Sequence, residues 1–196
     1  MAFQNSNFGQ AAQQGDKQKT NFPVGRINGS DARMDISIWK STSGIFTIFM
    51  IKQAVGKDPS SGMNVYENKS PSELPRVFFH TDSIRALQTA LDNADPNNIN
   101  INIQQNGSKN SSRMIISGAA NGQVKITLET SNNGNRTITL DAIPCGAINV
   151  NAAWLNLKEF VKIASKKALL SKMDPAEFGS AIGSSEESSS SEELPI

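Results

Sequence analysis

Apolar and polar residues alternate with a period of two over several stretches of the chain. The clearest stretch contains Met34, Ile36 and Ile38, whose neighbours are more polar, and this pattern is typical of a half-buried β-strand. Residues 41–44 have the composition of a turn and lead into residues 45–53, which are apolar on both faces and predict a second strand. The two segments together predict a β-hairpin.

The rest of the first half predicts a short strand over residues 24–28, an irregular stretch, and a strand followed by a helix. Residues 54–75 contain three prolines and two glycines and are too punctuated for regular structure. Residues 76–80 restore a strand, and Thr81-Asp82-Ser83 supplies side chains that cap a helix. Apolar residues then recur at helical spacing until Asp95-Pro96 ends the run. The first half therefore predicts four strands and one helix.

The second half repeats this order. Isoleucines alternate with asparagines over residues 99–103, which predicts a strand. Three more strands, separated by turns of the Asn-Gly type that favours hairpins, are predicted over residues 114–118, 124–130 and 136–141. A helix is predicted over residues 151–173, with an apolar side formed by Trp154, Leu157, Val161, Ala164 and Ala168. The predicted fold class is α+β, with two repeats of a four-stranded antiparallel sheet plus a helix.

Both ends of the chain differ in composition from the part between them. Residues 1–21 are rich in Gln and Asn, which predicts a flexible arm, and residues 22–175 are expected to form the folded domain. Residues 176–196 are predicted to form a disordered acidic tail, whose last eleven residues hold four glutamates. Residues 1–183 contain all 19 Lys and Arg but only 14 of the 18 Asp and Glu, a formal charge of +5. A basic body is therefore followed by an acidic end.

The composition argues against several classes of protein. No stretch approaches the roughly 20 apolar residues of a membrane span, and the N-terminus lacks the apolar core of a signal peptide. We therefore expect a cytoplasmic protein. With one histidine, His80, and one cysteine, Cys145, neither a metal cluster nor a Cys/His pair is expected. No phosphate-binding or nucleophile motif is present, so we expect no enzymatic activity and no cofactor or metal.

Aromatic side chains on the predicted strands are candidates for stacking on unpaired bases, where each stacked base contributes ~1–3 kcal/mol. Trp39 has the parity opposite to the apolar residues of its strand, so we expect it to point away from the core; the alternative is a tryptophan at the rim of that core. Phe46 and Phe49 have opposite parity, as do Phe78 and Phe79. One member of each pair is therefore expected at the surface.

Basic side chains on or beside the strands supply the positive charge that a single strand requires. The candidate nucleic-acid-binding residues are Arg33, Trp39, Lys40, Phe46, Phe49, Lys52, Arg76, Phe78, Arg113, Lys125 and Arg136. For each basic residue taken alone, an ordinary solvated charge is the alternative. The polar asparagines at 98, 100 and 102 suit hydrogen bonds to bases or sugars, or plain solvent. Lys158, Lys162 and Lys166 lie four residues apart on the last helix, where a polyanion, the acidic tail or solvent is expected to face them.

The end of the tail resembles that of bacterial and phage single-stranded DNA-binding proteins, which finish in an acidic stretch and a short apolar tip containing proline. The residues that carry this resemblance are Glu192, Glu193, Leu194, Pro195 and Ile196. The resemblance implies a docking peptide for replication or recombination proteins, although the family more often has Asp and an aromatic last residue. A tail that only keeps the protein soluble is the alternative.

The predicted order of elements, together with the segment Ile36-Ser37-Ile38-Trp39-Lys40, resembles the Whirly class of single-stranded DNA-binding proteins and the related half-size transcriptional coactivators. The resemblance covers roughly residues 23–173. It implies that single strands bind on the sheet faces while the helices form the centre. The Lys-Gly-Lys-Ala-Ala-Leu motif of plant Whirly proteins is absent from the sequence.

These features predict a non-catalytic, largely sequence-independent single-stranded DNA-binding protein that acts in replication, recombination or repair. The expected partners are single-stranded DNA, replication or recombination proteins that dock on the tail, and further copies of the chain in a homo-oligomer. A phage structural or assembly protein with a solubilising tail is the alternative. A single-strand-binding OB-fold is a third reading, which the helix after eight strands argues against.

Overall fold

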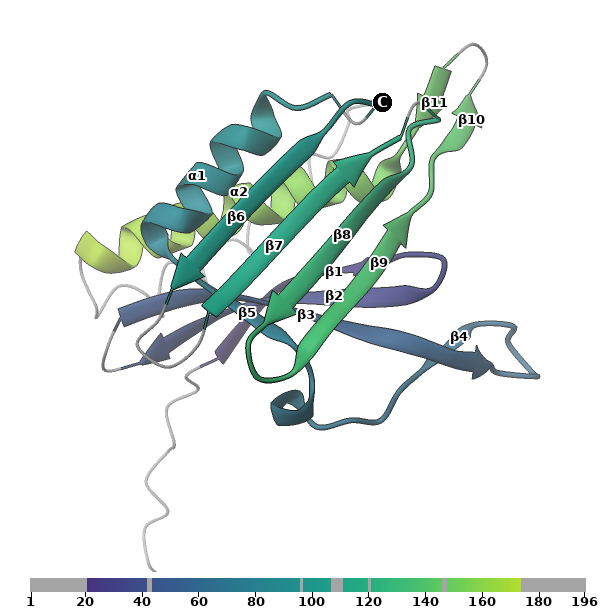
Figure 1. Ribbon diagram of the computed structural model, residues 1–196, viewed down its shortest axis with the longest axis horizontal. Coiled ribbons are helices and arrows are strands. Elements are labelled where there is room, and N and C mark those ends of the chain that lie inside the picture. The colour runs from purple at the N-terminus through teal and green to yellow at the C-terminus, as the bar shows by residue number, and fades with distance from the viewer. Residues whose placement is uncertain are drawn as a thin grey trace, which may run out of the picture.

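The computed structural model describes residues 21–41, 44–95, 97–106, 111–119, 121–145 and 148–173, shown in Figure 1. The acidic tail and the N-terminal arm, apart from Asn21, lie outside these residues. Asn21 belongs to the first strand, so it is part of the folded domain and not of the predicted arm.

The first sheet is antiparallel and contains the four strands expected from the first half of the chain. Its order is β1 (Asn21–Asn28), β2 (Ala32–Ser41), β3 (Gly44–Lys57) and β5 (Arg76–His80). Part of the stretch predicted to be irregular forms regular strands. The strand β3 continues to Lys57, and its end pairs with a fifth strand, β4 (Asn64–Tyr66). A 3₁₀ turn, η1 (Pro71–Glu73), precedes β5.

The second sheet contains the four strands expected from the second half. It follows the chain order β6 (Asn100–Asn106), β7 (Ser111–Gly118), β8 (Val124–Thr130) and β9 (Gly134–Leu140), all antiparallel. The Asn-Gly turn before β8 is confirmed, since Gly122 has φ +77°, a conformation that favours glycine. A small two-stranded ribbon, β10 (Ile143–Cys145) with β11 (Ile148–Val150), follows β9 and was not predicted.

The two predicted helices are α1 (Thr81–Asp92) and α2 (Ala152–Met173). The expected cap of α1 differs, because His80 occupies the N-cap position and its side chain makes no capping hydrogen bond. Asn151 precedes α2, and its Oδ1 accepts a hydrogen bond from the Trp154 N–H at 2.9 Å. The Asn151 amide also donates to the carbonyl oxygens of Gly122 and Leu140, which fixes the start of α2 to the second sheet.

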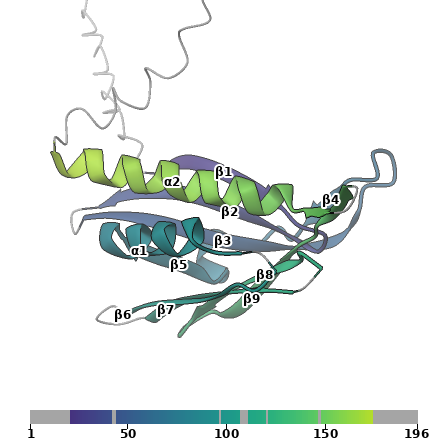
Figure 2. The same ribbon diagram turned by 90° about the horizontal axis from the view of Figure 1, so that it is seen from above.

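The core lies between the inner faces of the two sheets and the two helices, as Figure 2 shows. Alternation along β2 places Met34, Ile36 and Ile38 in this core, as predicted. The helix α2 lies across the inner face of the first sheet, close enough to β1 that a Cβ atom on Gly25 would come within 2.6 Å of the Phe160 ring. The apolar side of α2 predicted from the sequence is buried throughout.

Hydrogen bonds between side chains and the backbone join the two sheets where they cross. Gln53 of β3 donates through its side-chain amide to the Thr137 carbonyl oxygen of β9 at 2.8 Å, and the Thr139 N–H donates to the Asp31 carboxylate at 3.0 Å. At the other end of β9, Asn133 donates to the carbonyl oxygens of Ser72 and Leu74. Because these bonds come from three separate places, they fix the second sheet against the first.

Candidate nucleic-acid interface

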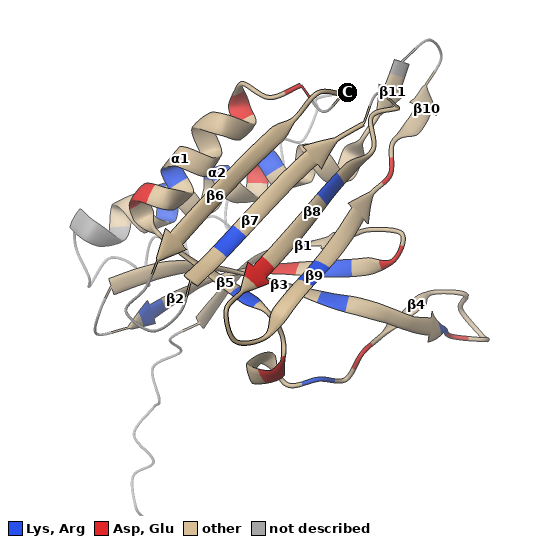
Figure 3. Ribbon diagram, in the orientation of Figure 1, with Lys and Arg blue, Asp and Glu red and all other residues tan. Residues whose placement is uncertain are grey.

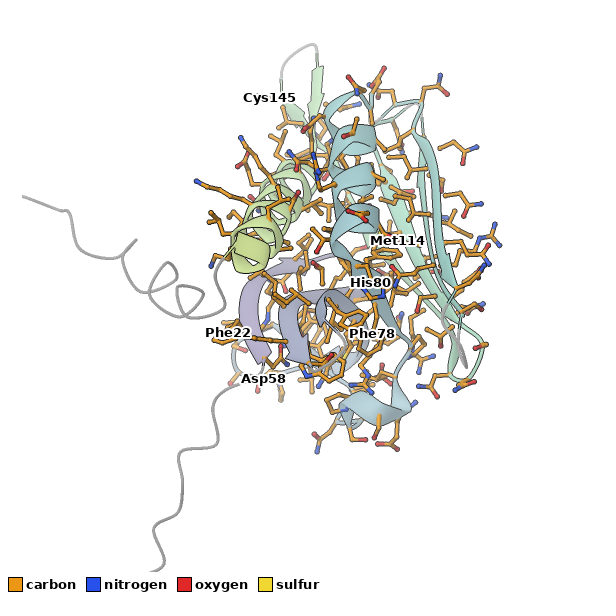
Figure 4. All side chains as sticks on the ribbon, turned by 90° about the vertical axis from the view of Figure 1, so that its left-hand side faces the viewer. Phe22, Asp58, Phe78, His80, Met114 and Cys145 are labelled. Atoms are coloured by element: carbon orange, nitrogen blue, oxygen red, sulfur yellow. The ribbon has the colours of Figure 1, made fainter. Side chains whose placement is uncertain are left out.

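Four aromatic rings gather on the outer face of the first sheet, the face turned away from the core. Trp39 lies opposite Phe46 in the β2–β3 pairing, Phe46 lies opposite His80 in the β3–β5 pairing, and Phe78 is two residues before His80. We call Trp39, Phe46, Phe78 and His80 the aromatic cluster. Figure 4 shows Phe78 and His80 near the junction of the two sheets.

The rings of the aromatic cluster contact one another edge to face or at a tilt. Ring centroids are separated by 5.7 Å for Trp39 and Phe46, by 6.1 Å for Trp39 and Phe78, and by 4.3 Å for Phe46 and His80. Trp39, Phe46 and Phe78 are half-buried, whereas His80 is exposed. Ile48, which lies opposite Phe78 on the same face, is only 8% exposed. Such a supported aromatic surface with exposed ring area is what unpaired bases stack on.

The alternation of strand residues decides which phenylalanines reach this surface. Phe46 and Phe78 lie on the outer face, whereas Phe49 and Phe79 are fully buried in the core with ring centroids 5.9 Å apart. The sequence prediction that included Phe49 among the binding residues is therefore corrected, because a base cannot reach it without unfolding the sheet. The expectation that Trp39 points away from the apolar face of its strand is confirmed.

Basic side chains border the aromatic cluster on the same face. The Arg76 guanidinium lies over the Phe78 ring at 5.4 Å from its centroid, and Lys52 lies opposite Arg33 in the β2–β3 pairing. Within the part of the chain that the structure describes, neither Arg76 nor Lys52 forms an ion pair. Their charges are therefore available to phosphates. Arg33 is less available, because it is paired with Asp35 at 3.5 Å and lies over the Tyr66 ring at 4.7 Å.

The other predicted basic residues lie elsewhere. Lys40 falls on the same side of β2 as Ile38, opposite to Trp39, so it is not part of the aromatic face. The lysines predicted on α2, Lys158, Lys162 and Lys166, also lie on the other side, because α2 packs on the inner face of the first sheet. Figure 3 shows basic residues on β7, β8 and β9 of the second sheet.

The outer face of the second sheet is polar and carries two of the predicted basic residues. Arg113 donates through Nε to the Asn102 side-chain oxygen at 2.9 Å and pairs with Glu129 at 3.4 Å. Lys125 lies on the same face, is exposed, and forms no ion pair with a described residue. The uncharged side of β6 predicted from its asparagines is present, since Asn100 and Asn102 are exposed. This face offers hydrogen bonds and charge but has no aromatic ring among its paired strand residues.

Arg136 performs a structural task instead. It pairs with Glu67 at 3.4 Å, and Glu67 also accepts a hydrogen bond from the Gln53 N–H at 3.0 Å. Burial raises the pKa of the Glu67 carboxyl, but the Gln53 hydrogen bond and the charges of Lys69 and Arg136 outweigh it, so the net pKa is lowered. The ionised pair links the segment after β4 to β9, and Arg136 is therefore engaged in holding the sheets together.

Two residues on the outer face of the first sheet, which carries the aromatic cluster, were not predicted from the sequence. His80 was read as a residue inside an apolar strand, yet it is exposed beside Phe46. Its shared parity with Phe78 was the signal that placed it on the same face. Tyr66 was not predicted because it lies in the stretch read as irregular, and only its pairing with Ala54 brings it to the sheet.

The described residues offer neither a cluster of metal ligands nor a membrane-spanning helix. They contain no group of three or more His, Cys, Asp or Glu side chains placed to hold a metal ion. They also include no helix with the length and apolar character needed to cross a membrane.

Comparison with known proteins shows a solved structure of similar fold. No protein-family description matches the sequence, and no curated protein matches it. The fold is similar to that in the crystal structure of WHY1 from Arabidopsis thaliana, with a TM-score of 0.51, 10% sequence identity, and coverage of 86% of this chain and 98% of that one. At this identity the similarity concerns the fold alone. The chain is an α+β protein with a Whirly-like fold, as the order of its elements predicted.

Proposed function

We propose that the protein is a non-catalytic, largely sequence-independent single-stranded DNA-binding protein acting in replication, recombination or repair. The observation that carries this proposal is the aromatic cluster, which places Trp39, Phe46 and Phe78 side by side on one sheet face with Arg76 over the last ring. Large aromatic side chains are normally buried, so three that share an outer face point to a ligand with flat apolar surfaces.

Unpaired bases fit this surface better than duplex DNA does. Each base that stacks on a ring contributes ~1–3 kcal/mol irrespective of its identity, because every base has a π-face. Arg76 and Lys52 supply charge for the phosphates beside the rings. Duplex DNA hides its base faces, so it would gain only the charge term. The Whirly-like fold supports the same function and assembly into a homo-oligomer, which we include in the proposal.

A gel shift with a 20-nucleotide oligo-dT at low salt, compared with a duplex of the same length, tests the proposal. We expect the single strand to shift at protein concentrations at which the duplex does not. Binding should weaken with salt, with a slope in log K against log salt of about −0.7 for each phosphate neutralised. Equal binding of duplex and single strand would contradict the proposal, as would the absence of any shift.

The acidic tail has two roles in this proposal, and its residues lie outside those described. We propose that Leu194, Pro195 and Ile196, with Glu192 and Glu193, dock replication or recombination proteins in the cytoplasm of a bacterium or a phage-infected cell. We also propose that the tail competes with DNA for the basic side chains beside the aromatic cluster. Its glutamates are negatively charged, as the phosphates of DNA are.

Removal of residues 184–196 is expected to tighten the binding of oligo-dT, because a competing polyanion is lost. The measurement is the Kd of the full chain and of the shortened chain at the same low salt. A control chain in which the tail glutamates become glutamine should bind like the shortened one. An affinity that stays unchanged or falls would count against competition by the tail.

One observation favours the alternative of a structural or assembly protein. The hairpin formed by the end of β3 and β4 exposes Val55, Met63 and Val65, of which Met63 is 70% exposed. The tip is ordered, since Asp58 accepts hydrogen bonds from Ser60 and Ser61 that lower its pKa to about 2. An apolar hairpin of this kind suits a protein contact. A protein that binds neither single-stranded nor duplex DNA would favour this alternative.

A further inference from the structure

A cavity of about 250 Å³ lies where the outer face of β5 meets the second sheet. Arg76 and Phe78 line it from the first sheet, and the facing wall comes from Ser112, Thr130 and the β8–β9 turn. Phe78 therefore belongs both to this cavity and to the aromatic cluster. The cavity is therefore next to the surface on which a ligand bound to Trp39, Phe46 and Phe78 would lie.

The cavity exists because β5 is the edge of the first sheet and is covered by side chains rather than by another strand. The Phe78 N–H donates to the Ser112 Oγ at 3.5 Å, and the His80 N–H donates to the Gln105 Oε1 at 2.8 Å. Side chains that satisfy an edge strand keep the neighbouring sheet farther away than a paired strand would be, since paired strands lie about 4.8 Å apart. The space between the sheets stays open at this point.

Asn133 gives the cavity a fixed hydrogen-bond acceptor. Its side-chain amide donates to the carbonyl oxygens of Ser72 at 3.1 Å and Leu74 at 3.0 Å, which uses both amide hydrogens and sets the orientation of the group. Its Oδ1 atom is then left to accept a hydrogen bond. Ser112 and Thr130 add hydroxyl groups, and Arg76 adds guanidinium donors. The lining thus combines an aromatic wall, a cation, hydroxyls and an oriented amide oxygen.

We infer that this cavity is a subsite for one unstacked nucleotide of the bound single strand. The base enters beside Phe78, and a ring N–H or exocyclic amine donates to the Asn133 Oδ1, while the attached phosphate lies at Arg76. At about 250 Å³ the space is below the roughly 300–1,000 Å³ of pockets that enclose drug-sized ligands, so it suits a single base. Unpaired bases are commonly held by stacking together with hydrogen bonds to their edges. The inference rests on the proposed function. It identifies the place where the bound strand leaves the aromatic cluster.

A substitution that fills the cavity from its exposed rim tests the subsite. Ser72 lies on the exposed 3₁₀ turn and lines the cavity, so Ser72→Trp is expected to occupy the space without disturbing the core. Because one base contact is lost, we expect oligo-dT to bind roughly 5- to 150-fold more weakly. Thr89→Trp is the matched control, since it adds the same side chain at an exposed position of α1 and should leave the Kd unchanged.

A second measurement needs no variant. In NMR spectra of the full chain, the Asn133 side-chain amide and the Ser112 and Thr130 backbone amides should shift when oligo-dT is added. They should not shift in the same way with an abasic phosphodiester chain of equal length, which has phosphates but no bases. The change in tryptophan fluorescence, recorded in parallel, reports whether the aromatic cluster is occupied, because the other tryptophan, Trp154, is buried in the core.

The outcomes separate the subsite from the proposed function. If oligo-dT binds but Ser72→Trp and Thr89→Trp bind it equally and the Asn133 amide does not shift, the subsite is wrong and the single-strand function stands. If the unaltered protein does not bind oligo-dT at all, both are wrong. If oligo-dT and the abasic chain produce the same shifts, the cavity receives a phosphate only, and the base subsite is overturned.

Discussion

Replacement of Trp39 with alanine is expected to weaken the binding of oligo-dT by roughly 5- to 150-fold, which corresponds to the loss of one stacked base. Trp39 contacts both Phe46 and Phe78, with ring centroids 5.7 and 6.1 Å away, so its indole ring forms a large part of the aromatic cluster. Its removal deletes the largest ring of the surface and leaves the core intact, because the Trp39 side chain lies on the outer face. Fluorescence anisotropy of labelled oligo-dT measures the change.

The combined replacement of Trp39, Phe46 and Phe78 should remove detectable binding at physiological salt, since only the charge of the surface would remain. Phe160→Leu is the matched control, because Phe160 lies against Gly25 on the opposite side of the first sheet and should leave the Kd unchanged. Binding by the triple variant as tight as that of the unaltered protein would show that the strand lies on another surface. The polar outer face of the second sheet would then be the next to test.

Phe49→Ala is expected to lower the free energy of unfolding by about 3–5 kcal/mol, whereas Phe46→Ala should lower it by only roughly 1 kcal/mol. Phe49 is fully buried and contacts Phe79, so truncation leaves a cavity between the sheet and the helices. Phe46 is half-buried on the outer face, where solvent fills the space that its ring leaves. Urea denaturation of the two variants under identical conditions measures the difference.

The affinity for DNA should change in the opposite order for the same two variants, with the larger loss in Phe46→Ala. Phe46→Ala is expected to weaken binding of oligo-dT, while folded Phe49→Ala protein, assayed at low temperature, should bind as the unaltered chain does. A folded Phe49→Ala variant with strongly reduced affinity, or a Phe46→Ala variant that loses as much stability, would contradict the assignment of the two faces.

Local pattern was sufficient for most of the fold. Alternation along residues 34–38 predicted the faces of β2, and the spacing of apolar residues in α1 and α2 predicted which sides are buried. Local pattern failed at β4, which holds only three residues and pairs with the extended end of β3. It also failed at the β10–β11 ribbon, whose strands are equally short. Strands this short carry too few alternations to give a signal, so their pairing depends on the rest of the fold.

The sequence predicted which types of residue form the candidate site, but it did not predict which individual residues belong to it. Parity alone divided each phenylalanine pair, but it gave no means of choosing between Phe46 and Phe49 because both faces of β3 are apolar. The pairing of β3 with β5 decided the choice, since it brought Phe46 beside His80 and Phe78. Arg136 and Lys40 were assigned to the site from their charge and their position on or beside strands. The partner of Arg136 and the register of Lys40 place them elsewhere.

The sequence by itself determined the order of the main strands and helices, the apolar faces of most of them, and the contrast between a basic body and an acidic end. These properties depend on neighbours within a few residues along the chain, which is why a period of two or of 3.6 reveals them. The tertiary structure alone decided which rings share a surface, which cations are free for phosphates, and that a cavity opens beside Phe78. These properties depend on strand pairing and on the crossing of the two sheets, which bring together residues as far apart in the sequence as Phe78 and Asn133.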